Sequence, residues 1–274
     1  MDGKSDSRLW DKVVLVTGAA GAIGYGVCEV LLEHGCLLVA TDLPGDRLAG
    51  FIIDLERNAP GRVMGAGIDV TDRASFAAGL DAAHAQWGRV NMVVHNAGIA
   101  HVAKLVELDL DVFRNLERVN IEGTLITISE TAKYLIQQKM GGDIVIMSTK
   151  NVPSPGAGFG AYSATKAACH QLGRIASLEL AEHDIRVNMV APDAVFSEGK
   201  YKSGLWAEVG PDRMKARGLD ESGLHEYYRN RNLLKSAVTG RDVGNAVAFF
   251  LSRMTPTTGA TIPVDGGLPD ATPR

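Results

Sequence analysis

Short runs of β-branched and other apolar residues alternate along this 274-residue chain with longer segments whose apolar residues recur at helical spacing. Short apolar runs are typical of strands buried on both faces, and their alternation with helical segments is typical of repeated βαβ units. Seven strands are predicted, at 13–17, 37–41, 63–67, 91–95, 144–147, 186–190 and 261–264. The predicted helical segments include 23–34, 72–86, 111–138, 163–182 and 240–251.

Right-handed crossovers between such strands place helices on both faces of a doubly wound parallel sheet. We therefore expect a single α/β domain over residues 1–274, with a Rossmann fold of about seven strands. Residues 1–10 are polar and are expected to form a tail. The segment 196–235 breaks the rhythm, because it is rich in charged, glycine and aromatic residues and follows a strand end where open sheets bind ligands. We interpret this segment as a substrate lid.

The composition of the chain limits the classes of molecule that it is expected to bind. A chain with 46% hydrophobic and 22% charged residues is expected to be globular, and a net charge of −4 gives no general attraction to nucleic acid or anionic lipid. Three cysteines, at 28, 36 and 169, match neither a zinc site nor a redox pair, so no metal is expected and a reducing cytoplasm fits. The N-terminus lacks the apolar run of a signal peptide, and no apolar stretch approaches the ~20 residues of a membrane span. The expected partner is a small molecule.

A glycine-rich turn, TGAAGAIG, follows the first strand and leads into a helix. Gly18, Gly21 and Gly24 permit a tight turn and a close approach of the backbone to a pyrophosphate, while the helix N-terminus favours negative charge. The spacing differs from Gly-x-Gly-x-x-Gly, and Ala22 is not a glycine. We interpret the turn as a dinucleotide site that includes Ala22 and Ile23, the alternative being a purely structural turn.

Asp42 ends the second predicted strand, 18 residues beyond Gly24. A carboxylate at this place can accept hydrogen bonds from the ribose hydroxyls of adenosine, whereas a 2′-phosphate would meet like charge. Neither Ala20 nor Leu43 supplies the arginine or lysine that would bind such a phosphate. These residues predict NAD as the cofactor. The alternative is that Asp42 only opens the Pro-Gly turn that follows.

Tyr162 and Lys166 lie four residues apart in a predicted helix, so their side chains project from one face. An ammonium near a phenol stabilises the phenolate, and at ~5 Å with an effective dielectric of ~20 the attraction is roughly 3 kcal/mol. That attraction would lower the tyrosine pKa by about two units. Taken alone, the spacing is common and also fits a buried tyrosine beside a solvated lysine.

The order and spacing of these motifs resemble the short-chain dehydrogenase/reductase family over nearly the whole chain. The resemblance implies that Tyr162 transfers the proton, that Lys166 lowers the tyrosine pKa and holds the nicotinamide ribose, and that Asn120 anchors a water that relays the proton. Beyond the glycine turn and Lys166, it implies cofactor contacts for the residues that follow the third and fourth strands, namely Asp69, Val70, Asn96, Ala97 and Gly98.

The chain departs from the family pattern at two places. The family's catalytic serine lies 13 residues before the tyrosine, where this chain has Thr149 with Ser148 beside it. A threonine hydroxyl can still orient a substrate oxygen, although its methyl group restricts the rotamer. After the sixth strand, Asp193 replaces a glycine. The resemblance still implies that the nicotinamide is held by Pro192, by the backbone near Val195 and by the Ser197 hydroxyl.

The last third resembles more closely the dehydrogenase part of bifunctional rhamnulose-phosphate aldolase/dehydrogenases, through PDAVF, the YYRNR run and TGATIPVDGGLP. Aromatic faces suit the C–H surface of a sugar, and an arginine fork suits a carboxylate, phosphate or sulfonate. For the charge-rich segment the alternative is a solvated helical surface. The residues expected to contact substrate are Lys150, Asn151, Phe196, Tyr228, Arg229 and Arg231.

We therefore expect NAD-dependent hydride transfer at a hydroxyl of a sugar, polyol or sugar acid, anionic sulfo- and phospho-sugars included. The resemblance also implies a homo-oligomer, a dimer or tetramer. Three alternatives stay open. The departures at Thr149 and Asp193 suggest a catalytically impaired NAD-binding regulator. The glycine turn also fits a sugar-nucleotide epimerase, although those chains are generally longer. The third alternative is a lactaldehyde-type small-aldehyde dehydrogenase.

Overall fold

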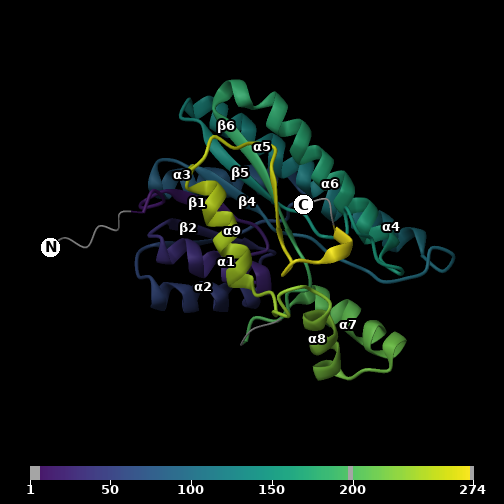
Figure 1. Cartoon of the computed structure of the whole chain (residues 1–274). Helices are drawn as coiled ribbons and strands as arrows, with labels where there is room; N and C mark the ends of the chain where they lie inside the picture. The colour runs from purple at the N-terminus through teal and green to yellow at the C-terminus, as the bar shows by residue number, and fades with distance from the viewer. Residues whose placement is uncertain (1–6, 197–199, 272–274) are drawn as a thin grey trace.

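The computed structural model describes residues 7–196 and 200–271 (Figure 1). A seven-stranded sheet in the order β3-β2-β1-β4-β5-β6-β7 forms its centre, and every pairing between neighbouring strands is parallel. The expected single α/β domain with a Rossmann-like sheet is confirmed. The strands are β1 (Val13–Val16), β2 (Leu37–Asp42), β3 (Val63–Gly67), β4 (Met92–His95), β5 (Gly142–Met147), β6 (Ile185–Pro192) and β7 (Thr261–Val264).

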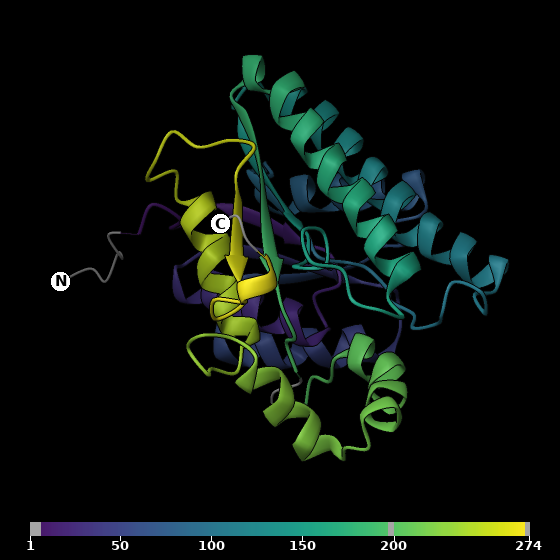
Figure 2. The same cartoon turned by 45° about the vertical axis from the view of Figure 1, so that its right-hand side comes forward.

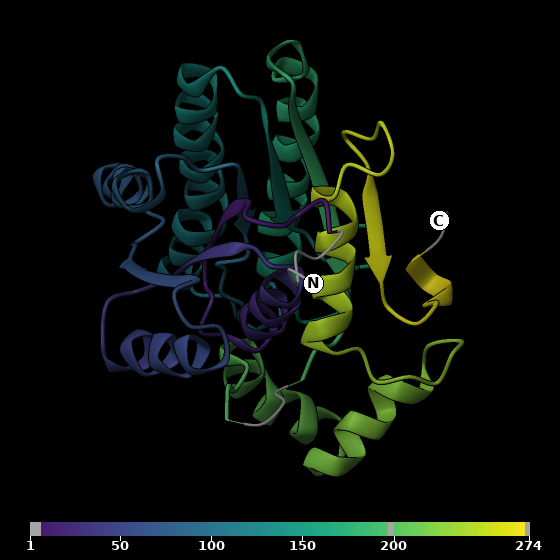
Figure 3. The same cartoon turned by 90° about the vertical axis from the view of Figure 1, so that its left-hand side faces the viewer.

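Helices cover both faces of the sheet (Figures 1 and 3). Because side chains alternate along a strand, Val14 and Val16 pack into the core on one face, while Val13 and Leu15 pack into the core on the other. This two-sided burial explains the continuous apolar runs of the sequence. The first face carries α1 (Ala22–Glu33), α2 (Asp46–Asn58) and α9 (Gly240–Leu251), and the second carries α3 (Arg73–Trp87), α5 (Gly123–Gln138) and α6 (Gly160–Glu179).

The helix predicted over 111–138 is interrupted. It consists of α4 (Leu110–Leu116), a π-helical turn η1 (Glu117–Glu122) and then α5. The Gly123 N–H donates to the Arg118 carbonyl five residues back, which widens the helix at this point. Such turns are frequent at functional sites, and this one carries Asn120. Helix α2 is a further difference, because the hydrophobic pattern did not single it out.

The expected lid contains two helices, α7 (Gly204–Arg217) and α8 (Glu221–Asn230). They project from the body of the molecule beyond the carboxyl end of β6 (Figures 1 and 2). The Phe196 ring stacks on the rings of His225 and Trp206, with centroids 3.7 and 4.4 Å apart. Tyr228 packs edge-on against Trp206 at 5.0 Å. The lid therefore has a small aromatic core of its own.

The two ends of the described chain also pack onto the domain. Leu9 is only 1% exposed and belongs to the main core, and the guanidinium of Arg62 lies 4.3 Å from the centre of the Trp10 ring. Leu9 and Trp10, which were expected to lie in a polar tail, therefore pack against the domain.

Two short 3-10 turns in the described part of the chain are η2 (Ala181–His183) and η3 (Pro269–Ala271). Among the helices of the described ranges, none combines the length and apolar character needed to cross a bilayer.

Candidate active site

The glycine turn connects β1 to α1 and lies against the end of β4. Gly18 has a positive φ of 61°, and a Cβ atom there would lie 2.9 Å from Ala97 Cα. Gly24 is equally confined, since a Cβ atom would lie 2.7 Å from Ala19 Cα. Within the described chain no side chain caps α1 at Gly21, so its first N–H groups have the arrangement that binds anions. These residues fit a dinucleotide pyrophosphate, and Ala22 and Ile23 begin the helix as expected.

The residues after β4 hold this turn in place. The Asn96 side-chain amide donates to the carbonyls of Thr17 and Gly18 at 3.1 and 2.9 Å. The Thr17 hydroxyl accepts hydrogen bonds from the N–H groups of Asn96 and Ala97, both at 3.0 Å. Asn96 and Ala97 thus join the carboxyl ends of β1 and β4, between which the strand order reverses. A ligand crevice is expected at such a point.

Asp42 lies beside the turn at the end of β2. Its carboxylate accepts hydrogen bonds from the N–H groups of Ala20 and Leu43, at 3.2 and 2.9 Å. Arg47, in the first turn of α2, donates to the Ala20 carbonyl at 2.8 Å, which places a guanidinium near Asp42. Sequence reasoning missed this arginine because it considered only Ala20 and Leu43. An arginine five residues after Asp42 was the available signal.

The two residues proposed for the adenine lie beyond β3. The Asp69 carboxylate accepts hydrogen bonds from the N–H and the hydroxyl of Thr71, at 2.9 and 2.8 Å. Val70 is buried and packs against α5, because a Cβ atom on Gly123 would lie 2.9 Å from a Val70 methyl group. Both residues stand at the same edge of the sheet as Asp42, and their adenine contact stays a prediction.

Thr149 and Tyr162 come together from the loop after β5 and the first turn of α6. Their side chains form a hydrogen bond. The neighbouring hydroxyl, that of Ser148, instead pairs with the ring of His170 at 3.0 Å from Nδ1. The structure therefore orients Thr149, and not Ser148, toward the tyrosine. The role of the Thr149 hydroxyl toward a substrate stays a prediction.

Lys166 lies one helical turn beyond Tyr162 and is only 5% exposed. Its ammonium donates to the Met147 carbonyl at 2.9 Å, and a Cβ atom on Gly98 would lie 3.2 Å from its Nζ. Burial lowers the pKa of this lysine. Burial also raises the pKa of Tyr162 to about 12, against the lowering by its hydrogen bond with Thr149. The expected lowering of the tyrosine pKa is wrong for this arrangement, because desolvation outweighs the favourable contacts.

Asn120 is fully buried in the π-helical turn. Its side-chain oxygen accepts from the Ile99 N–H, while its amide donates to the Ile99 carbonyl and the Thr165 hydroxyl, each at 2.9 Å. Its own carbonyl accepts from the Thr124 hydroxyl and from the Cys169 thiol, the latter at 2.9 Å. Asn120 thereby fixes the segment next to Gly98. The backbone carbonyl of Asn120 thus has two protein donors, and the expected role of Asn120 in holding a relay water stays a prediction.

The loop after β6 explains one departure from the family pattern. The Asp193 carboxylate accepts from Arg231 at the end of α8, with 3.2 Å from Nε and 2.6 Å from Nη2 to Oδ2. The aspartate therefore connects the sheet to the lid. The Pro192 carbonyl accepts from the Lys150 N–H at 3.2 Å, and Val195 is buried and forms a bridge with Val238. Ser197 lies outside the described residues.

The short-chain dehydrogenase family model matches residues 12–206, which include the glycine turn and the Tyr162–Lys166 pair. The chain belongs to the short-chain dehydrogenase family. As a member it is an oxidoreductase that acts on CH–OH groups, and members use the nicotinamide cofactors NAD or NADP.

This short-chain dehydrogenase is similar to an uncharacterized oxidoreductase, a butanediol dehydrogenase and a sorbitol-6-phosphate dehydrogenase. An uncharacterized oxidoreductase, YuxG, of Bacillus subtilis is 34% identical over 267 residues, which are 96% of this chain but 38% of that protein. The L-2,3-butanediol dehydrogenase of Corynebacterium glutamicum is 29% identical and is covered to 98%, with 94% of this chain aligned. The crystal structure of sorbitol-6-phosphate 2-dehydrogenase SrlD from Erwinia amylovora superposes with a TM-score of 0.84 at 26% identity, covering 93% of this chain and 98% of that one.

The residues expected to contact substrate lie in two parts of the dehydrogenase, the lid and the loop after β5. Arg229 is 51% exposed on α8 and lies 3.7 Å from Glu226, so the structure does not bring it to the site. Arg231 is occupied by Asp193 and lies 4.4 Å above the Tyr228 ring. Phe196 and Tyr228 lie within the aromatic core of the lid. Contacts of these four lid residues with a substrate stay a prediction.

The other two substrate candidates lie beside Thr149. Asn151 is buried, and its N–H donates to the Thr149 hydroxyl at 3.3 Å. Lys150 is half-buried, and its ammonium donates to the Ser154 carbonyl at 3.2 Å. The strand-end loop therefore brings a hydroxyl, an amide and an ammonium into one short segment near Tyr162.

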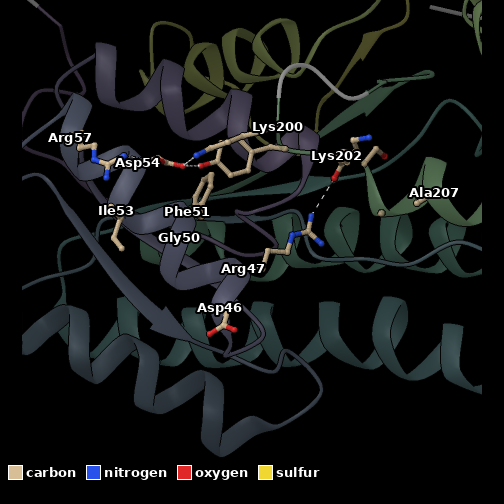
Figure 4. A pocket seen from close by; sticks show the side chains of 13 residues that line it. Asp46, Arg47, Gly50, Phe51, Ile53, Asp54, Arg57, Lys200, Lys202 and Ala207 are labelled. Atoms are coloured by element: carbon tan, nitrogen blue, oxygen red, sulfur yellow. Dashed lines mark hydrogen bonds and ion pairs between the residues drawn. The ribbon is translucent and has the colours of Figure 1, made fainter.

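Residues 200–204 of the lid lie against α2, where they line a cavity of about 650 Å³ (Figure 4). Lys200 and Tyr201 both contact the Asp54 carboxylate. Arg47 donates to the Lys202 carbonyl at 3.3 Å and also to the glycine turn. The lid is therefore attached to the part of the molecule that holds the proposed dinucleotide site.

Proposed function

We propose that this dehydrogenase transfers a hydride between NAD and a hydroxyl-bearing carbon of a polyol, sugar or sugar acid. The observation that carries the proposal is the hydrogen-bonded pair Thr149–Tyr162, with Lys166 one turn away and next to Gly98. This pair stands at the carboxyl edge of the sheet, as does the glycine turn. Two of the relatives described above are named for polyol substrates, butanediol and sorbitol 6-phosphate.

In this proposal Tyr162 moves the proton and Thr149 orients the oxygen that gains or loses it. The raised pKa keeps Tyr162 protonated at neutral pH, which is the form that donates a proton to a carbonyl oxygen during reduction. During oxidation the phenol first loses its own proton to solvent, and the phenolate oxygen then takes the hydroxyl proton of the substrate. Lys166 would bind the nicotinamide ribose, and Asn120 would hold the Gly98–Ile99 backbone against it. NAD, when bound, supplies the hydride acceptor.

The choice of NAD is supported by Asp42, and its test is a change of cofactor preference. The wild type should prefer NAD, because a 2′-phosphate near this carboxylate should lose at least ~1.4 kcal/mol, or tenfold, in binding. Asp42→Ala should narrow the ratio of kcat/KM for NAD over NADP at least tenfold, and Arg47 should then assist NADP by pairing with the phosphate. Steady-state rates with both cofactors measure this ratio.

Asp46→Ala is the matched control, since it removes an exposed carboxylate from the first turn of α2 and should leave the ratio unchanged. In the double variant Asp42→Ala, Arg47→Ala, part of the gain with NADP should disappear. Equal use of NAD and NADP by the wild type would contradict the proposed cofactor choice.

The reaction itself is tested by following NADH formation over a panel of polyols, aldoses and sugar acids. Oxidation of at least one polyol or sugar is expected, with a higher kcat/KM than for long apolar alcohols. A chain that binds NAD but oxidises no member of the panel would instead fit the regulator, and a preference for apolar alcohols would overturn the substrate class.

We also propose a homo-oligomer in the cytoplasm. The outer surfaces of α5 and α6, which pack side by side, expose Leu125, Ile136, Ile175 and Leu178, the last at 76%. Exposed apolar residues on adjacent helices suit a subunit interface. All three cysteines are buried and none of them forms a disulfide, in line with a reducing compartment.

A further inference from the structure

Two cations stand beside the catalytic pair without a carboxylate partner. Lys150 directly follows Thr149, and its position is set by the hydrogen bond from its N–H to the Pro192 carbonyl. Arg213 approaches from α7 of the lid. Its guanidinium donates to the Ala157 carbonyl and to the Tyr228 hydroxyl, both at 3.3 Å. Within the described ranges, neither Lys150 nor Arg213 forms a salt bridge.

Arg213 lies near the catalytic tyrosine. The guanidinium is 5.0 Å above the Phe159 ring, and that ring is centred 6.1 Å from the Tyr162 ring. Phe159 and Tyr162 share an apolar cluster with Val209 of α7, so the helix that carries Arg213 packs directly beside the catalytic residues. The arginine therefore lies one aromatic ring away from the catalytic tyrosine.

Lys150 and the charged groups around it carry more positive than negative charge. Asp193 is already engaged by the guanidinium fork of Arg231, and the charges of Arg231 and Arg213 both act on the Lys150 ammonium. Asp270 contributes a carboxylate, but it is exposed. Burial and the two neighbouring guanidinium groups lower the pKa of Lys150, while Asp193 raises it. Half-buried like charges are unfavourable unless an opposite charge joins them.

We propose that Lys150 and Arg213 bind an anionic group of the substrate, a phosphate monoester or a carboxylate at the end of a polyol or sugar chain. A compact ammonium and a planar guanidinium together suit the oxygens of such a group. The reacting hydroxyl then lies at Thr149 and Tyr162, while the anion is held by the lid and the β5 loop. This inference rests on the proposed dehydrogenase function and names its substrate class.

The test compares a neutral hexitol, sorbitol, with its terminal phosphate ester and with the six-carbon aldonate, at constant ionic strength and saturating NAD. We expect kcat/KM to be at least tenfold higher for one of the two anions, and the better anion distinguishes phosphate from carboxylate. Lys150→Met and Arg213→Met should each lower the ratio of anion to neutral substrate at least fivefold. Lys215→Met, which removes an exposed cation from α7, should leave the ratio unchanged.

Sorbitol serves as the internal reference, so a variant that loses activity through misfolding lowers both rates and not their ratio. Equal or better use of sorbitol by the wild type would overturn the inference, and so would ratios that both variants leave intact.

If no compound is oxidised, the proposed function fails and the anion site is judged separately. Thermal unfolding with inorganic phosphate, against chloride at equal ionic strength and with NAD present, should raise the midpoint of the wild type but not of the two variants. No rise with phosphate in the wild type, or an equal rise in all three proteins, would overturn the anion site on its own.

Discussion

Tyr162→Phe is expected to lower kcat by roughly 10² or more while leaving NAD binding intact. The phenylalanine keeps the ring that packs with Phe159 and Val209, but it has no proton to move. Because the phenolate is the base for oxidation and burial raises the tyrosine pKa, the wild-type oxidation rate should rise with pH. The residual activity of the variant should lose that rise.

The measurement is the steady-state rate of NADH formation, with NAD affinity followed separately by fluorescence. Tyr134→Phe is a suitable control, because it removes a hydroxyl that pairs with His84 far from the catalytic pair, and its kcat should stay within about twofold. A loss of less than tenfold in Tyr162→Phe would rule out this tyrosine as the proton-transfer residue.

Thr149→Val should remove most activity, whereas Thr149→Ser should retain it. Valine keeps the shape of the side chain but cannot donate to a substrate oxygen, and serine restores the hydroxyl without the methyl group. An effect of roughly 10²-fold on kcat/KM is expected for the valine variant, in line with one positioned hydrogen-bond donor.

Ser148→Ala separates the two neighbouring hydroxyls. The Ser148 hydroxyl pairs with His170, so its removal should change kcat/KM much less than the loss of the Thr149 hydroxyl. If Ser148→Ala were damaging and Thr149→Val harmless, the hydroxyl that acts on the substrate would be the one on Ser148.

The strands were predictable because their physical requirement is local. A strand buried on both faces must be apolar at consecutive positions, and β1 meets that requirement throughout, as does β4 up to its last residue, His95. The glycine turn was predictable for a similar reason, since Gly18 and Gly24 lie where a Cβ atom would collide with nearby backbone.

The interruption of the long helix was not predictable, because a π-helical turn adds one residue without altering the apolar character of its surroundings. The partners of charged residues were also hidden. Because 37 residues separate Asp193 from Arg231 in the chain, the two side chains come close only when the lid folds. The direction of the Tyr162 pKa shift was predicted wrongly for a related reason, because the extent of burial depends on the tertiary structure.

The ion pair between Asp193 and Arg231 makes two distant positions depend on each other during divergence. Replacing Asp193 by the family's glycine would leave a partly buried guanidinium without its partner, beside the charges of Lys150 and Arg213. Losing Arg231 first would leave a carboxylate among the lid contacts. A lineage that exchanges this lid for one of another specificity therefore has to change both residues together, or pass through an intermediate with an unpaired charge near Lys150.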